Sequence, residues 1–430
     1  MAVELDTRQP DSLQPLPQPD QPLPNAAQIP LQTFHLPSFP PQASQLKDLT
    51  LTSDIKPTEY ADLLATPLSA DAIPSSLPAS IESLTLELFS LGYPPSFLDS
   101  LSRGLPRLRA LTLYSHLVDG VSDGSRKDAG EFFHNVLVGK KENGGGLRQL
   151  HLLDVFSRKG LMSGIGDILD DMGSNALIRL LEVSYTYRGH SDSGFLARIP
   201  GDELPGLLVP SLVAVSFRLS SMLVSPDGEG EGESQFPDDP ADVDVDGVRI
   251  PGAKPQGIIP LHPAHPGMEL LMKKLAGHDG PESLEPGSSP SSGPGPRGLK
   301  MLDCTLYTLS LEQLTTILSS QNELAILAAS VLVQEKETLL DTLRNGSKDL
   351  EAVEIVGVPK EAVEVGSISN QDTSFRALFP TTSDMTDLST RLPRLNSFTM
   401  TILRAASFGS VTWTRAWDGG WEGGTVGGQK

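Results

Sequence analysis

Ten short stretches of the chain share one pattern, in which the first, fourth and sixth positions are apolar and many of the positions between them are polar. Side chains alternate between the two faces of an extended segment, so the fourth and sixth positions point to the same side of a strand. The first position lies at the bend that leads into that strand. Apolar residues at helical spacing follow most stretches, which predicts a repeating unit of strand, loop, helix and loop. The stretches begin at Leu46, Ile81, Leu108, Leu147, Ile178, Leu212, Leu299, Leu324, Leu350 and Leu395.

The intervals between these stretches indicate a solenoid. Most of them are between 25 and 39 residues long, and one unit cannot cover its own apolar edge, whereas stacked units can. Helices are bulkier than strands, so a stack of such units bends with the helices outside. We therefore predict an α/β fold: a solenoid with a curved parallel sheet on its concave side and helices on its convex side.

Changes in composition divide the chain into five parts. Residues 1–42 contain ten prolines and no hydrophobic period, which predicts a disordered tail, with docking to an SH3 or WW domain as the alternative. Residues 43–222 and 299–405 are the two repeat blocks. Residues 223–298 form an insert that is acidic and rich in Pro, Gly and Ser, so we expect it to be mostly disordered apart from a short helix at Met268–Leu275.

The last part, residues 406–430, holds all three tryptophans before a Gly-rich tail. Trp413, Trp417 and Trp421 fall within nine residues, and such clustering favours a cap over the exposed edge of the last repeat. The alternative is a binding hot spot, because Trp next to Arg415 is also typical of interface anchors.

Charge and cysteine content narrow the classes of partner. The chain of 430 residues has a formal net charge of −21, which argues against nucleic acid and anionic membranes as partners. Its one cysteine, Cys304, occupies a sixth position and is expected to be a buried hydrophobic residue. The first residues show no signal-peptide pattern, so we expect an intracellular, cytoplasmic or nuclear protein.

Three motifs suggest chemistry but lack the context that the chemistry needs. Gly120–Gly124 matches the nucleophile string G-x-S-x-G, yet Ser122 lies in a charged loop several residues after the strand. Asp242–Gly247 begins like a calcium loop, but Ala253 stands where the bidentate Glu is required. His262 and His265 lack further ligands for zinc. We therefore predict no enzymatic activity, cofactor or metal.

The repeats that begin at Leu108, Leu147, Leu299 and Leu350 resemble leucine-rich repeats of the longer, helix-containing kind. The Leu-Pro-Arg-Leu entries at 105–108 and 392–395 are similar to the repeat regions of fungal F-box proteins, although no F-box is recognisable. The ninth positions lack the Asn or Cys that usually ties successive turns, so we expect an irregular array. These positions hold His116, Val155, Thr186, Ser220 and Tyr307.

The predicted function is that of a non-enzymatic scaffold that binds a partner protein on the concave face. If the apolar positions face inward, the residues between them face the partner. The F-box resemblance implies an alternative, a substrate-recognition subunit of an SCF-type ubiquitin ligase that binds a Skp1-type adaptor. The expected partner contacts are Tyr114, His151, Glu182, Arg218, Asp303 and Glu354, together with Trp413 and Trp417.

Overall fold

The computed structural model describes residues 25–74, 77–114, 117–139, 146–187, 194–221, 258–276, 293–365, 374–403 and 409–424. These residues form one open sheet of thirteen strands, which lie side by side in chain order. Neighbouring strands from β1 to β11 are parallel, and β12 and β13 are antiparallel additions at the end. The strands are β1 (Ala26–Leu31), β2 (Asp48–Ser53), β3 (Ser83–Glu87), β4 (Ala110–Tyr114), β5 (Gln149–Leu153), β6 (Leu180–Tyr187), β7 (Ala214–Ser221), β8 (Met301–Leu309), β9 (Ile326–Val333), β10 (Ala352–Pro359), β11 (Ser397–Ile402), β12 (Gly409–Arg415) and β13 (Trp421–Gly423).

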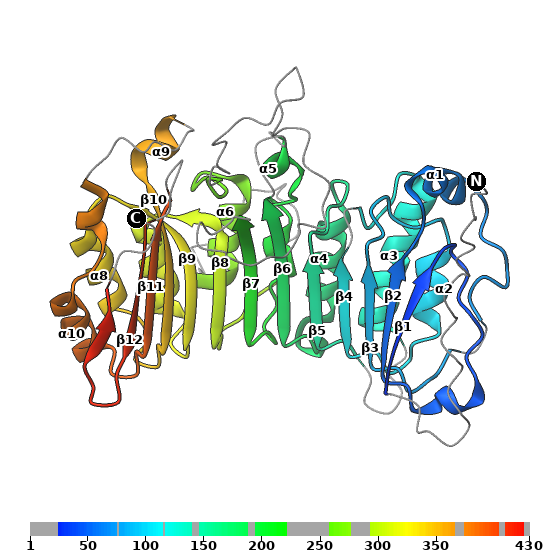
Figure 1. Ribbon diagram of the computed structural model, residues 1–430, viewed down its shortest axis with the longest axis horizontal. Helices are drawn as coiled ribbons and strands as arrows, with labels where there is room; N and C mark the ends of the chain where they lie inside the picture. Colours follow the sequence, from blue (N-terminus) through cyan, green and yellow to red (C-terminus); the bar gives the residue numbers. More distant parts are fainter. Residues whose placement is uncertain are drawn as a thin grey trace, which may run out of the picture.

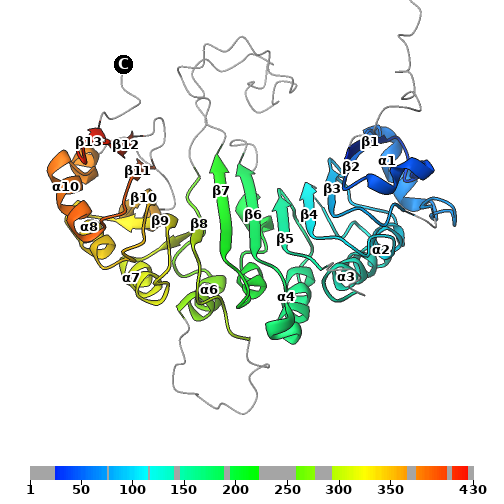
Figure 2. The same ribbon diagram turned by 90° about the horizontal axis from the view of Figure 1, so that it is seen from below.

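The sheet is curved, with its strands on the concave side and most of the helices along the convex side (Figures 1 and 2). The α-helices are α1 (Pro57–Ala65), α2 (Phe97–Arg103), α3 (Asp123–Val138), α4 (Leu161–Met172), α5 (Phe195–Arg198), α6 (Pro266–Ala276), α7 (Leu311–Ser320), α8 (Lys336–Arg344), α9 (Lys360–Val365) and α10 (Thr382–Arg391). Short 3-10 helices lie at Pro41–Gln45, Gly173–Asn175, Leu204–Leu207 and Ser374–Leu378. The prediction of an α/β fold with a curved, mostly parallel sheet is confirmed.

The ten apolar stretches correspond to the ten consecutive strands β2 to β11, each of which begins two residues after the first apolar position. Their fourth positions pair with one another in a single row across the sheet, and every member of that row is buried on the helix side. The row is Leu49, Leu84, Leu111, Leu150, Leu181, Val215, Leu302, Leu327, Val353 and Phe398. The hydrophobic core therefore runs between sheet and helices along the whole arch.

Backbone hydrogen bonds at the second position of each stretch join one coil to the next. From Glu82 to Asn396, each second-position N–H donates to the carbonyl oxygen of the second position in the preceding coil, at 2.7–2.9 Å. Serine hydroxyls add to this ladder, because Ser80 donates to the Leu46 carbonyl and Ser211 to the Ile178 carbonyl, each at 2.7 Å. The stacking is thus more regular than the missing Asn side chains suggested.

The irregularity that exists is concentrated in β8. Residues 301–304 pair in register with β9, but pairing resumes only at Thr308, so β8 carries a bulge. Leu261, from the insert, lies against this bulge, and its N–H donates to the Leu306 carbonyl oxygen at 2.9 Å. The insert then forms α6, which confirms the predicted short helix. The acidic residues 226–246 lie outside the described residues.

The two ends of the sheet compare differently with the sequence-based boundaries. The predicted disordered tail extends to residue 42, but β1 pairs with β2, and Leu31, Phe34 and Leu36 are buried. The tail prediction is therefore wrong for residues 26–42, because these apolar side chains cover the first core edge. At the other end, the hairpin of β12 and β13 buries Trp413 and Trp421, so a tryptophan cap forms.

Candidate functional site

The concave face carries a polar row made by the fifth positions of the stretches. This row contains four of the predicted contacts, His151, Glu182, Asp303 and Glu354, and Tyr114 and Arg218 lie two residues further along their own strands. The structure thus brings the six predicted concave residues onto two adjacent rows of one surface. The complete fifth-position row is Thr50, Thr85, Thr112, His151, Glu182, Ser216, Asp303, Ala328, Glu354 and Thr399.

His151 and Glu182 form a side-chain pair across β5 and β6. Their Nδ1 and Oε2 atoms are 2.7 Å apart, and both side chains are partly exposed to the concave solvent. Because an exposed pair of this kind contributes only about 0.2–1 kcal/mol to stability, it leaves both groups available for a partner. Glu354 and Arg218 are exposed on the same face.

Contrary to the prediction, Asp303 does not face solvent. Asp303 is only 4% exposed, because the β8 bulge places Thr305 over its carboxylate. The Thr305 hydroxyl and N–H donate to Oδ1 at 2.8 and 3.0 Å, and the Ser216 hydroxyl donates to Oδ2 at 3.2 Å. Burial raises the pKa of Asp303, against the lowering effect of these hydrogen bonds. Asp303 therefore orders the bulge rather than contacting a partner.

A hollow of about 330 Å³ opens on the concave face and spans β7 to β12. Glu354 lines it together with residues that the sequence did not single out: hydroxyl groups, aliphatic walls and a part of the insert. The sequence could have predicted the hydroxyls, because Ser, Thr and Glu recur between the apolar positions of these strands. No sequence pattern indicated that the insert contributes to the lining. The lining residues are Leu219, Ile258, Pro260, Thr305, Ser330, Glu354, Val356, Thr401, Leu403 and Ser410.

The two predicted tryptophan contacts separate in the structure. Trp413 is 4% exposed and belongs to the core of the cap, so the prediction that it contacts a partner is wrong. Trp417 lies in the turn between β12 and β13 and is 100% exposed. Of the two, only Trp417 is presented to solvent, and it lies apart from the concave row, beyond the start of β11.

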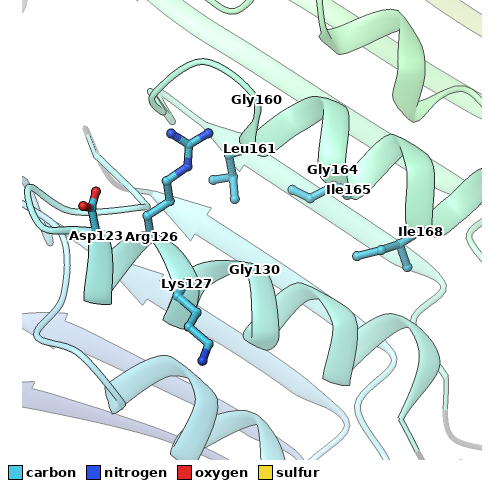
Figure 3. A pocket seen from close by; sticks show the side chains of 9 residues that line it. All are labelled: Asp123, Arg126, Lys127, Gly130, Gly160, Leu161, Gly164, Ile165 and Ile168. Carbon is cyan, nitrogen blue, oxygen red and sulfur yellow. The ribbon is translucent and has the colours of Figure 1, made fainter. Parts of the chain in front are cut away.

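A second hollow, of about 570 Å³, lies on the convex side between α3 and α4 (Figure 3). Leu161, Ile165 and Ile168 line it from α4, and Arg126 and Lys127 line it from α3. The Arg126 guanidinium donates to the Lys159 carbonyl oxygen and so bridges the two coils. The pocket is a groove between successive helices, and Asp123 lines it as well.

The motifs that suggested catalysis or metal binding have structural roles where they are described. The Ser122 hydroxyl accepts the Ser125 N–H at 3.0 Å and so caps α3. His262 Nδ1 and His265 Nδ1 accept nearby backbone N–H groups. The Asp242–Gly247 string lies outside the described residues, among which no three metal-ligating side chains form a cluster. Cys304 is buried, as predicted, and burial raises the pKa of its thiol.

Comparison of the chain with protein-family models and with curated proteins finds no match. In the part of the chain that the structure describes, none of the helices combines the length and apolar character needed to cross a bilayer. The ubiquitin-ligase alternative and its Skp1-type adaptor stay predictions.

Proposed function

We propose that this protein is a non-enzymatic interaction scaffold that binds a partner protein on the concave face of its sheet. The observation that supports this most directly is the hollow that spans β7 to β12. Its lining combines aliphatic side chains with hydroxyls and the exposed Glu354, and it continues into the fifth-position row. Protein–protein interfaces combine apolar area with hydrogen-bonding groups in this way.

The resemblance of the repeats to leucine-rich repeats supports the same proposal. In that architecture, stacked strands make an extended curved surface that binds proteins. Here His151, Glu182 and Glu354 lie along that surface. A partner that presents cations toward Glu182 and Glu354, and an apolar side chain toward the hollow, fits these residues.

Combined charge reversal tests this proposal. Glu182→Lys together with Glu354→Lys is expected to remove the partners that wild-type protein captures, because both changes place cations where the partner's cations would lie. The measurement is affinity purification from cells that make the protein at its natural level, with quantitative mass spectrometry of the recovered proteins. Glu354→Lys alone is the second variant, since Glu354 is exposed and its replacement leaves the His151 pair intact.

Glu131→Lys with Glu337→Lys is the matched control. Both glutamates are exposed on helices of the convex side, so this variant has the same change in net charge without altering the concave face. It should recover the wild-type set of partners. Recovery of that same set by the concave variants, at wild-type thermal stability, would overturn the proposal.

A further inference from the structure

Exposed cations line the edge of the sheet at which strands β5, β6 and β8 begin. Arg148, Arg179 and Lys300 occupy the second position of their stretches, and the backbone ladder fixes all three along one line. Among the described residues, neither Arg148 nor Lys300 forms an ion pair. Arg179 donates one long hydrogen bond, of 3.4 Å, to the Ser211 carbonyl oxygen. A chain of net charge −21 thus has a local positive row.

An apolar row lies beside these cations, at the third positions of the same stretches. Leu180, Ala214, Met301 and Ile326 pair with one another in register across β6 to β9. Ile326 is 42% exposed, and the other three are partly exposed. These side chains lie on the concave face, away from the core that the fourth and sixth positions fill. We call the cations and the apolar row together the amino-edge strip.

The charges of the strip repel one another in the free protein. Adjacent parallel strands are about 4.8 Å apart, so the Arg148 and Arg179 positions lie on neighbouring coils about that far apart, and Lys300 follows two coils later. Like charges on neighbouring strands are destabilising. Carboxylates between the cations would remove that repulsion, and aliphatic side chains beside them would cover the apolar row.

We infer that the amino-edge strip binds an acidic segment of the partner protein, one in which carboxylates alternate with aliphatic side chains. The inference rests on the proposed scaffold function and names the chemistry of its partner. Glu182 lies two residues after Leu180 on β6, about 7 Å along the strand, and Glu354 lies on β10, the strand next to Ile326; both repel carboxylates. They confine an acidic segment to the edge of the sheet.

The probe for this inference is a short fluorescein-labelled peptide of repeated Glu-Glu-Leu, with repeated Lys-Lys-Leu as the opposite-charge control. Fluorescence anisotropy measures binding to the full chain at low ionic strength. Arg148→Glu, Arg179→Glu and Lys300→Glu together are expected to weaken binding of the acidic peptide about tenfold or more, and added salt should weaken wild-type binding. Binding of the lysine peptide should not be weakened by the same three substitutions, because the cations of the strip repel it.

A matched variant separates the strip from the general field of the protein. Lys127→Glu, Lys273→Glu and Arg391→Glu make the same change in net charge at exposed positions of convex-side helices. This variant should bind the acidic peptide as wild type does. Equal weakening in both triple variants would overturn the inference, as would tighter binding of a single-stranded oligonucleotide than of the acidic peptide at the same residues.

A stability measurement supplies a readout that does not need a ligand. Arg148→Gln removes one repelling charge, so its thermal midpoint should equal or exceed that of wild type while peptide binding weakens. A loss of both would indicate a structural role for Arg148 and overturn the inference. Glu182→Lys with Glu354→Lys should leave binding of the acidic peptide intact or strengthen it, so the failure of the scaffold proposal and that of this inference are distinguishable.

Discussion

At the scale of single residues, Asp128 shows how one coil caps the helix of the preceding coil. Helix α2 begins after Ser96, whose side chain makes no capping hydrogen bond. The Asp128 carboxylate of α3 accepts the N–H groups of Leu98 and Asp99 instead, at 2.9 and 3.0 Å. Burial nevertheless raises the pKa of Asp128 to about 6, with the nearby Asp99 adding to the rise.

This pKa predicts a pH dependence of stability. The folded pKa of about 6 exceeds the ordinary value of 3.8, so protonation of Asp128 favours the folded state. This stabilisation is fully present below pH 3.8 and is lost as the pH rises through 6. From this group alone, the free energy of unfolding should be about 1.4 kcal/mol higher near pH 5 than near pH 7.5. Urea unfolding of wild type and Asp128→Asn at the two pH values measures it. Identical pH slopes for the two proteins would contradict the prediction.

At the scale of elements, α4 contains two glycines with opposite surroundings. A Cβ added to Gly164 would have no atom within 4 Å, because this position lines the groove toward α3 (Figure 3). A Cβ added to Gly166 would lie 3.0 Å from the Gly206 carbonyl oxygen. Gly166 therefore permits the close approach of the 3-10 helix at Leu204–Leu207. No neighbouring atom requires a glycine at position 164.

Alanine at these two positions should change stability in opposite directions. Gly164→Ala is expected to stabilise the protein by about 0.5–1 kcal/mol, because alanine restricts the unfolded chain and favours the helix. Gly166→Ala should destabilise it, since the backbone of the neighbouring coil must move. Chemical denaturation of both variants compares two substitutions that are chemically the same and two residues apart. Equal effects would show that local helix propensity, and not packing between coils, decides the outcome.

At the scale of the whole molecule, the apolar stretches predicted the strands that repeat and missed those that do not. Strands β1, β12 and β13 lack the three-position pattern, because each lies at an end where only part of a coil is needed. The burial of Asp303 was missed for a different reason. The β8 bulge depends on a contact with Leu261, which lies far earlier in the chain, and alternation within one strand cannot show such a contact.

The candidate site was predictable to the same extent. Alternation placed His151, Glu182, Arg218 and Glu354 on the concave face, and the register then determined which of them share a row. The walls of the hollow depend on Ile258 and Pro260 of the insert, whose position follows from tertiary packing. Sequence alone thus predicted which residues lie on the concave face, and the structure was needed to find the hollow in that face.

Packing of α6 makes the insert part of the arch. The Lys274 side chain is 0% exposed, and its Nζ lies 2.8 Å from Asp170 Oδ1 on α4. Asp170 also accepts the Gly293 N–H at 2.9 Å, at the point where the described chain resumes toward β8. One carboxylate therefore ties α4, α6 and the approach to the second repeat block.

Removing one partner of this ion pair should be costly for the whole arch, because the Lys274 ammonium is fully buried. Lys274→Ala is expected to lower the free energy of unfolding by about 3–5 kcal/mol, because Asp170 loses its cation. Asp170→Ala leaves a fully buried ammonium and should cost at least as much. The double variant should cost less than the sum of the two, which a double-mutant cycle by urea unfolding measures. Hydrogen exchange should show the largest loss of protection in α6 and in β7 and β8 beside it, since the two repeat blocks meet there. Strictly additive costs would mean that the pair contributes no coupling, and that the apolar contacts of Met268 and Leu271 alone hold α6 in place.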